Sequence, residues 1–201
     1  MSAQAAPPYP LTFTVDYPDR ELNRVTTGFR LILAIPLLVL LALFAYGHPA
    51  SAGLLLFLPV LALLVVRHKY PRWWFDFNLQ LTRLEARIYS YIFLLRDEYP
   101  SVDDQQAVHV DIVYPDANNE LNRWLPLVKW LLAIPHYIVL VVLEIAVVVV
   151  VIVAWFAILF TGRYPRGIFD FVVGVERWAL RVAAYAFLLV TDRYPPFSLA
   201  P

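Results

Sequence analysis

One long apolar run, residues 125–160, constrains the fold of this chain more than any other feature. As a single helix, its 36 residues would measure about 54 Å. The hydrocarbon core of a bilayer is only about 30 Å thick, so the run must fold back to fit within it. A turn near Glu144 would leave arms of about 31 and 27 Å, each long enough to span a membrane. The run therefore predicts a transmembrane helical hairpin.

A second pair of apolar stretches lies earlier in the chain, at residues 31–46 and 53–66. The segment GHPASAG at residues 47–53 separates them, and its Gly, Pro and Ser residues favour a turn. Hydrophobic residues make up 61% of the chain, whereas soluble proteins contain about 45–50%. We therefore expect a mainly α-helical membrane protein with four spanning helices, arranged as two hairpins.

Similar segments occur twice along the chain, in the same order, which is typical of a tandem repeat. VDYPDRELNR at residues 15–24 matches VYPDANNELNR at 113–123, and KYPRWWFDF at 69–77 matches RYPRGIFDF at 163–171. We expect two units, each with a short β-strand, a transmembrane helical hairpin and an interfacial amphipathic helix. The predicted organisation is a flexible N-terminus at 1–10, one unit at 11–100, a linker at 101–106, a second unit at 107–197 and a C-terminal tail at 198–201.

Each unit is predicted to begin with a strand, because apolar and polar residues alternate at residues 11–17 and 108–114. These two strands could pair into a small cytoplasmic sheet. Farther on, polar residues recur at helical spacing and form one stripe in each unit. The stripes are Asp76, Gln80, Arg83, Arg87 and Ser90, and then Asp170, Gly174, Arg177, Arg181 and Ala184. We expect both helices to lie at the membrane interface. The alternative, a fifth and a sixth spanning helix, would place the arginines at a costly depth.

The basic residues predict an orientation in the membrane. None of the sixteen Lys and Arg residues lies in either predicted hairpin tip, near His48 or Glu144. Since basic loops stay on the cytoplasmic side, a multi-pass topology with both termini in the cytoplasm follows. A cleaved signal peptide at the first apolar run is the competing interpretation, and the second apolar run, deep in the chain, argues against it.

The sequence gives little sign of catalytic or metal chemistry. The chain has no cysteine, and its four His residues have no partner at metal-ligand spacing. No nucleophile or phosphate-loop motif is present, so we expect no enzyme activity, no cofactor and no metal. Zero net charge gives no reason to expect nucleic acid as a partner. Three ionisable residues fall within the long apolar run and are candidate intramembrane polar groups: Lys129, His136 and Glu144.

Basic residues of the Tyr-Pro-Arg blocks and of the helical stripes are candidate contacts to lipid headgroups or to a partner's acidic surface. In each block, a basic residue, an interfacial Tyr and a helix-breaking Pro would turn the chain into the plane of the membrane. The candidate contacts are Lys69, Arg72, Arg83, Arg87, Arg163, Arg166, Arg177 and Arg181.

Three segments carry a family resemblance: IVYPDANNELNRWLPLVKWLLAIPHYIVL at 112–140, WFAILFTGRYPRGIFDFVVGVERWALRVAAYAFLL at 155–189 and TDRYPPF at 191–197. They resemble the bacterial domain-of-unknown-function family 4389, a set of small integral membrane proteins. The resemblance implies a location in the bacterial cytoplasmic (inner) membrane and carries no established activity. The first unit resembles the family in degenerate form and has Trp73 in place of the Gly of RYPRG.

Together these observations predict a non-enzymatic integral membrane protein that is a scaffold or accessory subunit of a bacterial membrane protein complex. Its expected partners are membrane lipids and other membrane protein subunits. The alternative is a lipid-binding or small-solute transport protein with a site between the two units. An intramembrane enzyme is the third interpretation, and no nucleophile–base pair supports it.

Overall fold

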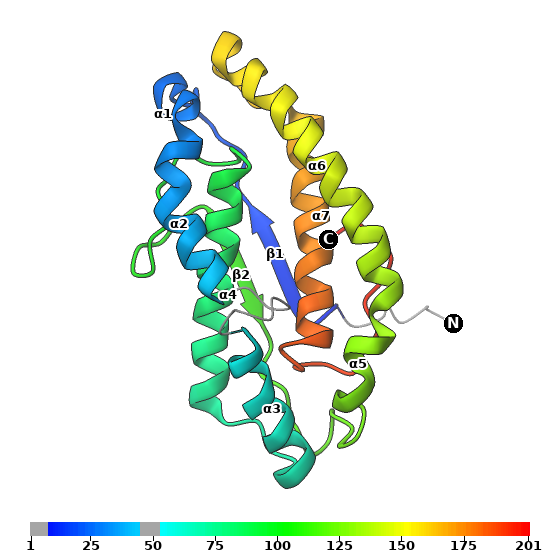
Figure 1. The fold of residues 1–201 in the computed structure, drawn as a ribbon. Coiled ribbons are helices and arrows are strands. Elements are labelled where there is room, and N and C mark those ends of the chain that lie inside the picture. Colours follow the sequence, from blue (N-terminus) through cyan, green and yellow to red (C-terminus); the bar gives the residue numbers. More distant parts are fainter. Residues whose placement is uncertain (1–7, 45–52) are drawn as a thin grey trace, which may run out of the picture.

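The computed structural model describes residues 8–44 and 53–201, which form seven helices and one pair of strands (Figure 1). Most of the predicted flexible N-terminus and the predicted hairpin tip at residues 47–52, with His48, lie outside the described residues. In chain order the elements are β1 (Leu11–Val15), α1 (Arg24–Gly28), α2 (Arg30–Phe44), α3 (Gly53–Arg67), α4 (Arg72–Ile92), β2 (Val108–Ile112), α5 (Pro126–Leu132), α6 (Ile134–Thr161) and α7 (Arg166–Ala186).

The two strands pair in antiparallel fashion, which confirms the pairing predicted from the sequence. Phe13 lies opposite Val110 at the centre of the register, and both side chains are buried. In each strand the apolar residues are buried and the intervening polar residues are exposed. The alternation of side chains along a strand therefore gives the sheet one buried face.

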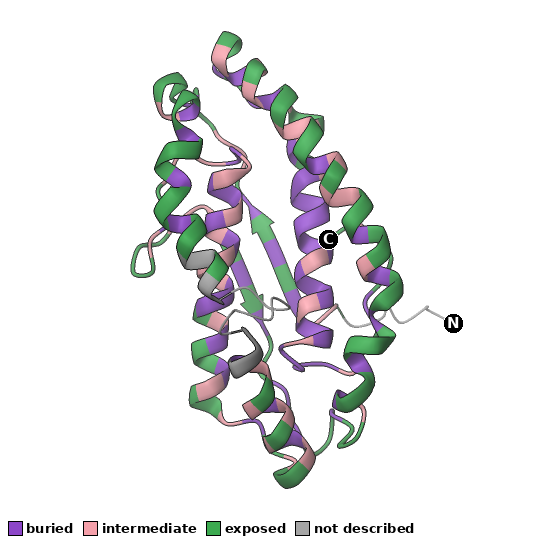
Figure 2. Cartoon of the chain, in the orientation of Figure 1, coloured by how far each residue is buried: buried purple, intermediate pink, exposed green. Residues whose placement is uncertain are grey.

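The helices α4 and α7 cover that face, with α4 on β2 and α7 on β1. Each is 21 residues long and follows a Pro in extended conformation, Pro71 or Pro165, because proline favours a helix start. Most residues of α7 are buried, as Figure 2 shows in purple. The prediction that the two amphipathic helices lie at a membrane interface is wrong for α7, because its polar stripe faces protein.

The prediction of four spanning helices is wrong. Within residues 8–44 and 53–201, one helix, α6, is long and apolar enough to cross a membrane. The chain does not turn at Glu144, since no Gly or Pro lies between Pro135 and Gly162 to break the helix. Gly162 ends α6 in the left-handed conformation, with φ of 73°. The helices α2 and α3 have 15 residues each, about 22 Å, which is short of a bilayer core.

The structure also does not show the predicted repeat of two equal units. The first half of the chain forms α1 to α4, whereas the second half forms α5 to α7, with α6 continuous. The expectation that both termini share one side of the membrane depended on two hairpins and loses that basis.

Candidate functional site

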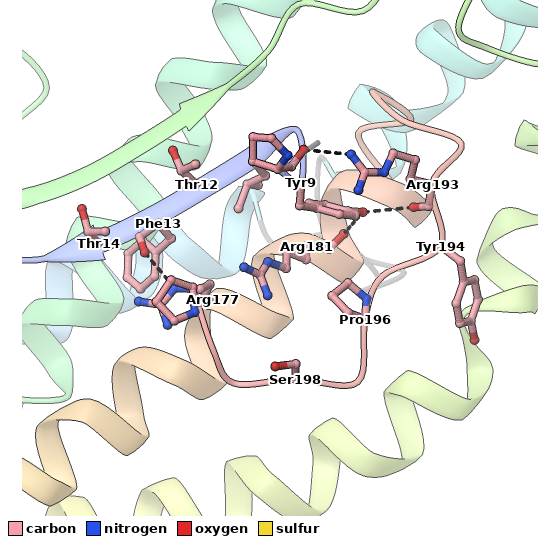
Figure 3. A pocket seen from close by; sticks show the side chains of 13 residues that line it. Tyr9, Thr12, Phe13, Thr14, Arg177, Arg181, Arg193, Tyr194, Pro196 and Ser198 are labelled. Atoms are coloured by element: carbon pink, nitrogen blue, oxygen red, sulfur yellow. Dashed lines mark hydrogen bonds between the residues drawn. The ribbon is translucent and has the colours of Figure 1, made fainter. Parts of the chain in front are cut away.

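A pocket of about 460 Å³ lies between β1 and α7, and the chain after Tyr194 closes it (Figure 3). It joins parts of the protein from opposite ends of the sequence. Among the residues that line it are Tyr9, Phe13, Arg177, Arg181, Arg193 and Ser198.

Arg177 and Arg181 lie on one face of α7, because residues four apart in a helix are neighbours. Arg177 donates from Nε to the carbonyl oxygen of Phe13 at 3.0 Å and from Nη1 to that of Leu199 at 2.9 Å. Arg181 donates from Nη1 to the carbonyl oxygen of Ala200 at 3.0 Å. The two arginines therefore hold the end of the chain against α7 and β1.

Both arginines are deeply buried, with 9% of Arg177 and 5% of Arg181 exposed. Desolvation lowers the pKa of each guanidinium, and the neighbouring positive charge of Arg181 lowers that of Arg177 further. Among the described residues, no carboxylate lies within 4.0 Å of either guanidinium group. Nε of Arg181 is buried and has no hydrogen-bond partner within residues 8–44 and 53–201. The pocket thus holds positive charge that backbone carbonyls only partly balance.

The rest of the pocket is largely apolar. Phe13 points toward α7, whereas the side chains of Thr12 and Thr14, which also line the pocket, project from the other face of β1 (Figure 3). The Tyr9 hydroxyl donates to the carbonyl oxygens of Arg181 and Arg193, each at 3.3 Å. Arg193 donates from Nη1 to the carbonyl oxygen of Pro8 at 2.8 Å. Guanidinium groups beside an apolar wall suit an anionic group attached to an apolar body.

On α4, the arginines of the stripe have a different electrostatic environment. Arg83 donates from Nε to the carbonyl oxygen of Val110 at 2.9 Å and forms an ion pair with Asp111 at 2.7 Å. Arg87 donates to the carbonyl oxygen of Ser101. The structure therefore separates the four stripe arginines into two pairs, and only the pair on α7 lines the pocket.

The basic residues of the Tyr-Pro-Arg blocks are exposed and lie outside the pocket. Arg72 pairs with Asp76 at 3.1 Å and Arg166 with Asp170 at 3.2 Å, each across one helical turn. The other two exposed basic residues are Lys69 and Arg163. Contact of these four residues with lipid or a partner stays a prediction.

Lys129, one of the candidate intramembrane polar groups, points into the protein. It is fully buried and forms an ion pair with Asp192, with 2.6 Å between Nζ and Oδ1. Nζ also donates to the carbonyl oxygen of Thr191 at 2.7 Å. Lys129 therefore fixes α5 to the segment after α7.

His136 and Glu144 both lie on α6, and the structure does not bring them to the pocket. His136 is buried, and its Nδ1 accepts a hydrogen bond from Nε1 of Trp178 on α7 at 3.0 Å. Glu144 lies in the middle of the continuous helix instead of at a hairpin tip. Within the described part of the chain, no three His, Asp or Glu side chains are grouped as metal ligands.

Sequence reasoning missed the part of the pocket formed by the two ends of the chain. Tyr9 fell in the predicted flexible N-terminus, and Leu199 and Ala200 fell in the predicted tail. The polar stripe on α7 was the one signal for this pocket in the sequence. Arginines that become buried need hydrogen-bond acceptors, and a backbone carbonyl of a neighbouring strand can be one.

The fold and the pocket define a mainly helical protein in which α4 and α7 cover a strand pair and one long apolar helix remains exposed. Residues 124–198 match the family model described as Domain of unknown function (DUF4389), in agreement with the resemblance found in the sequence. The matched segment contains Arg177 and Arg181, whereas β1 and α4 lie before it. No curated protein and no solved structure matches the chain.

Proposed function

We propose that this protein is a non-enzymatic integral membrane protein that acts as a scaffold or accessory subunit of a membrane protein complex. The observation that supports this proposal is the apolar, exposed surface of α6. Its 28 residues extend about 42 Å, and only 17% of its most apolar window is buried by the rest of the protein.

A core helix of a soluble protein would bury such a surface. On α6, however, Val142, Ile145, Val149 and Phe160 are each more than half exposed. Figure 2 shows exposed residues in green along this helix. An apolar surface of this extent is costly in water and favourable in a lipid or protein environment.

The helix α5 extends the same surface, with one exposed Trp shortly before it and another within it. Trp124 and Trp130 are at least half exposed, and tryptophan is enriched at membrane–water boundaries. Lys129, the charged residue of α5, is turned inward to Asp192. The outer side of α5 and α6 therefore offers lipid or a partner subunit a surface with little charge.

Membrane fractionation tests this proposal directly. The full chain should stay with membranes after extraction at alkaline pH and should require detergent for release. A double variant, Val142→Asp with Val149→Asp, places two charges seven residues apart on the exposed side and should reduce membrane recovery severalfold. The matched control, Asn118→Asp with Asn119→Asp, adds the same charge to an exposed loop and should leave recovery unchanged. Recovery of the unaltered chain in the soluble fraction would exclude an integral membrane protein.

The subunit role has its own test. Mild-detergent purification followed by native mass spectrometry should yield a complex with stoichiometric protein partners. A monomer without protein partners would argue against the scaffold role.

A lipid-binding or small-solute transport protein is the second candidate function. The pocket favours lipid binding, because it lies between β1 from the first half of the chain and α7 from the second, and it contains two buried guanidinium groups.

A further inference from the structure

We propose that the pocket between β1 and α7 binds a phosphate-bearing anion through Arg177 and Arg181. The inference deepens the lipid-binding alternative of the proposed function, and its phosphate test does not depend on a membrane location.

Among the described residues, Arg177 lacks the carboxylate partner that Arg83 has. Arg83 and Arg177 both donate from Nε to a strand carbonyl, that of Val110 for Arg83 and that of Phe13 for Arg177. The residue after Val110 is Asp111, which pairs with Arg83 at 2.7 Å, whereas the residue after Phe13 is Thr14. An external anion would supply the negative charge that the chain provides beside Arg83.

Burial strengthens this argument. The side chain of Arg83 is 32% exposed, so water as well as Asp111 stabilises its charge. Arg177 and Arg181 are more than nine-tenths buried and have little contact with water. A buried cation without a counterion costs far more than an exposed one, so an anion bound there is stabilised strongly.

Arg177 and Arg181 also have more hydrogen-bond donors than the protein's acceptors engage. Two guanidinium groups carry about ten N–H bonds, five each. Within the described part of the chain, three hydrogen bonds engage them, to the carbonyl oxygens of Phe13, Leu199 and Ala200. Nε of Arg181 is buried and has no partner among the residues of this part. Planar guanidinium groups with free N–H bonds match the oxygen geometry of phosphate.

A purely structural role is the competing explanation. In that view the arginines serve only to attach residues 199 and 200 to the helix. Carbonyl oxygens account for the three hydrogen bonds, but they carry only partial charges, and no carboxylate of the described residues lies within 4.0 Å of either guanidinium group.

The shape of the pocket indicates the class of ligand. A volume of about 460 Å³ is within the usual range for small-molecule sites and exceeds what a bare phosphate ion fills. Leu11, Phe13 and Pro196 line it beside the guanidinium groups. The headgroup of an anionic phospholipid and a free phosphate compound share the required chemistry, and the test below distinguishes these two sources.

The test uses the full chain, purified in detergent, with two probes. Inorganic phosphate is titrated by calorimetry, and nanodiscs of phosphatidylglycerol are compared with nanodiscs of phosphatidylcholine. We expect saturable binding of at least one probe, weakened about tenfold or more by Arg181→Gln, because one charge-assisted contact is lost. Thr14→Asp should weaken binding similarly, since it places a carboxylate where Asp111 stands beside Arg83, and it keeps both arginines intact.

Arg83→Gln is the matched control, because it removes an arginine whose charge Asp111 already balances, and it should leave binding unchanged. Preference for phosphatidylglycerol would identify a lipid source, and phosphate binding without that preference would identify a free phosphate compound. Absence of binding to both probes, or wild-type affinity in both Thr14→Asp and Arg181→Gln, would overturn the inference. If the protein binds phosphate but is recovered in the soluble fraction, the membrane proposal is wrong and the inference of an anion-binding pocket still holds.

Discussion

The two helix–strand layers of this protein, α4 on β2 and α7 on β1, have equivalent contacts between an arginine and a strand carbonyl. They differ in whether a carboxylate balances the charge of that arginine. In each layer an arginine Nε donates to the central carbonyl of the strand. The α4 layer balances that arginine with Asp111 and leaves it partly exposed, whereas the α7 layer buries it without a carboxylate. The carbonyl contact positions the helix, and the presence of a counterion is a separate property that can change without altering the packing.

A second pair of contacts shows the opposite case, in which both halves of the chain keep their counterion. Arg30 is buried and pairs with Asp97, and Lys129 is buried and pairs with Asp192. In both, the second carboxylate oxygen accepts a backbone N–H, from Asn23 or Asn122. A buried cation with a structural role is therefore neutralised within the chain, which distinguishes it from Arg177 and Arg181.

The largest effect should follow from breaking this neutralisation. Lys129→Met should lower the free energy of unfolding by about 3–5 kcal/mol, because it leaves Asp192 without its buried partner. Arg30→Met should cost a similar amount if the two pairs are equivalent. Chemical unfolding in detergent measures both. Adding Asp192→Asn to Lys129→Met should recover part of the loss, and a double variant as unstable as the sum of the two single variants would contradict the pairing.

Buried carboxylates give the next largest effect and extend the comparison to pH. Desolvation, and to a lesser degree the charge of Glu144, raises the pKa of Glu176 on α7 from 4.5 to about 8. A raised pKa in the folded state means that stability is full below about pH 4.5 and falls as pH rises toward 8. Glu176→Gln should remove this loss, and its stability relative to the unaltered protein should rise by no more than about 5 kcal/mol between pH 4 and pH 9.

Glu85 on α4 provides the corresponding test in the other layer. Desolvation raises its pKa to about 8 as well, so Glu85→Gln should change the pH dependence in the same direction. Thermal unfolding across pH 4 to 9 measures both variants. For each variant, the difference in stability from the unaltered protein should change between pH 4 and pH 9. A constant difference would show that Glu176 and Glu85 do not have raised pKa values.

A smaller effect is expected at the ends of the long helices. Gly162 ends α6 with φ of 73°, and a Cβ there would lie 2.9 Å from the Glu21 side chain. Gly162→Ala should therefore lower the free energy of unfolding by about 1–2 kcal/mol. His68, after α3, has φ of 52° and a 2.7 Å contact from Nε2 to the carbonyl oxygen of Leu121.

In His68→Gly, relief of the left-handed conformation offsets the lost contact, so a change of less than about 1 kcal/mol is expected. Gly167→Ala is the control, because no atom lies within 4 Å of the added Cβ. Denaturant midpoints of the three variants test this ranking. Equal loss in Gly162→Ala and Gly167→Ala would show that backbone conformation does not determine the cost.

The smallest effect belongs to the ion pair that distinguishes the two layers. Asp111→Asn should cost no more than about 1 kcal/mol, because the Asp111 side chain is 73% exposed. Added salt should reduce the difference between the variant and the unaltered protein further. A loss well above this value would mean that the α4 layer depends on its counterion for stability.

Periodicity in the sequence was sufficient to predict the strands and the helices that follow the Tyr-Pro-Arg blocks. Alternation identified the two strands, and the 3.6-residue period placed Arg177 and Arg181 on one face. The same period does not say what covers that face, so lipid headgroups were expected where the protein has strand carbonyls. The turn at Glu144 failed for a related reason, because it rested on bilayer thickness while the local sequence lacks a helix breaker.

The packing of β1 against α7 also determines the order in which parts of the protein can fold during synthesis. Val15 ends β1 and Arg166 begins α7, so 150 residues separate the first strand from the helix that covers it (166 − 15 − 1). Closing a loop of that length is slow compared with forming helices, because its entropy is lost before any contact is gained. During synthesis α4 emerges before β2, and the two can meet early. The first strand to be synthesised, β1, is therefore the last core element to be packed. A chain released before α7 is synthesised would leave Leu11 and Phe13 without the helix that packs on them.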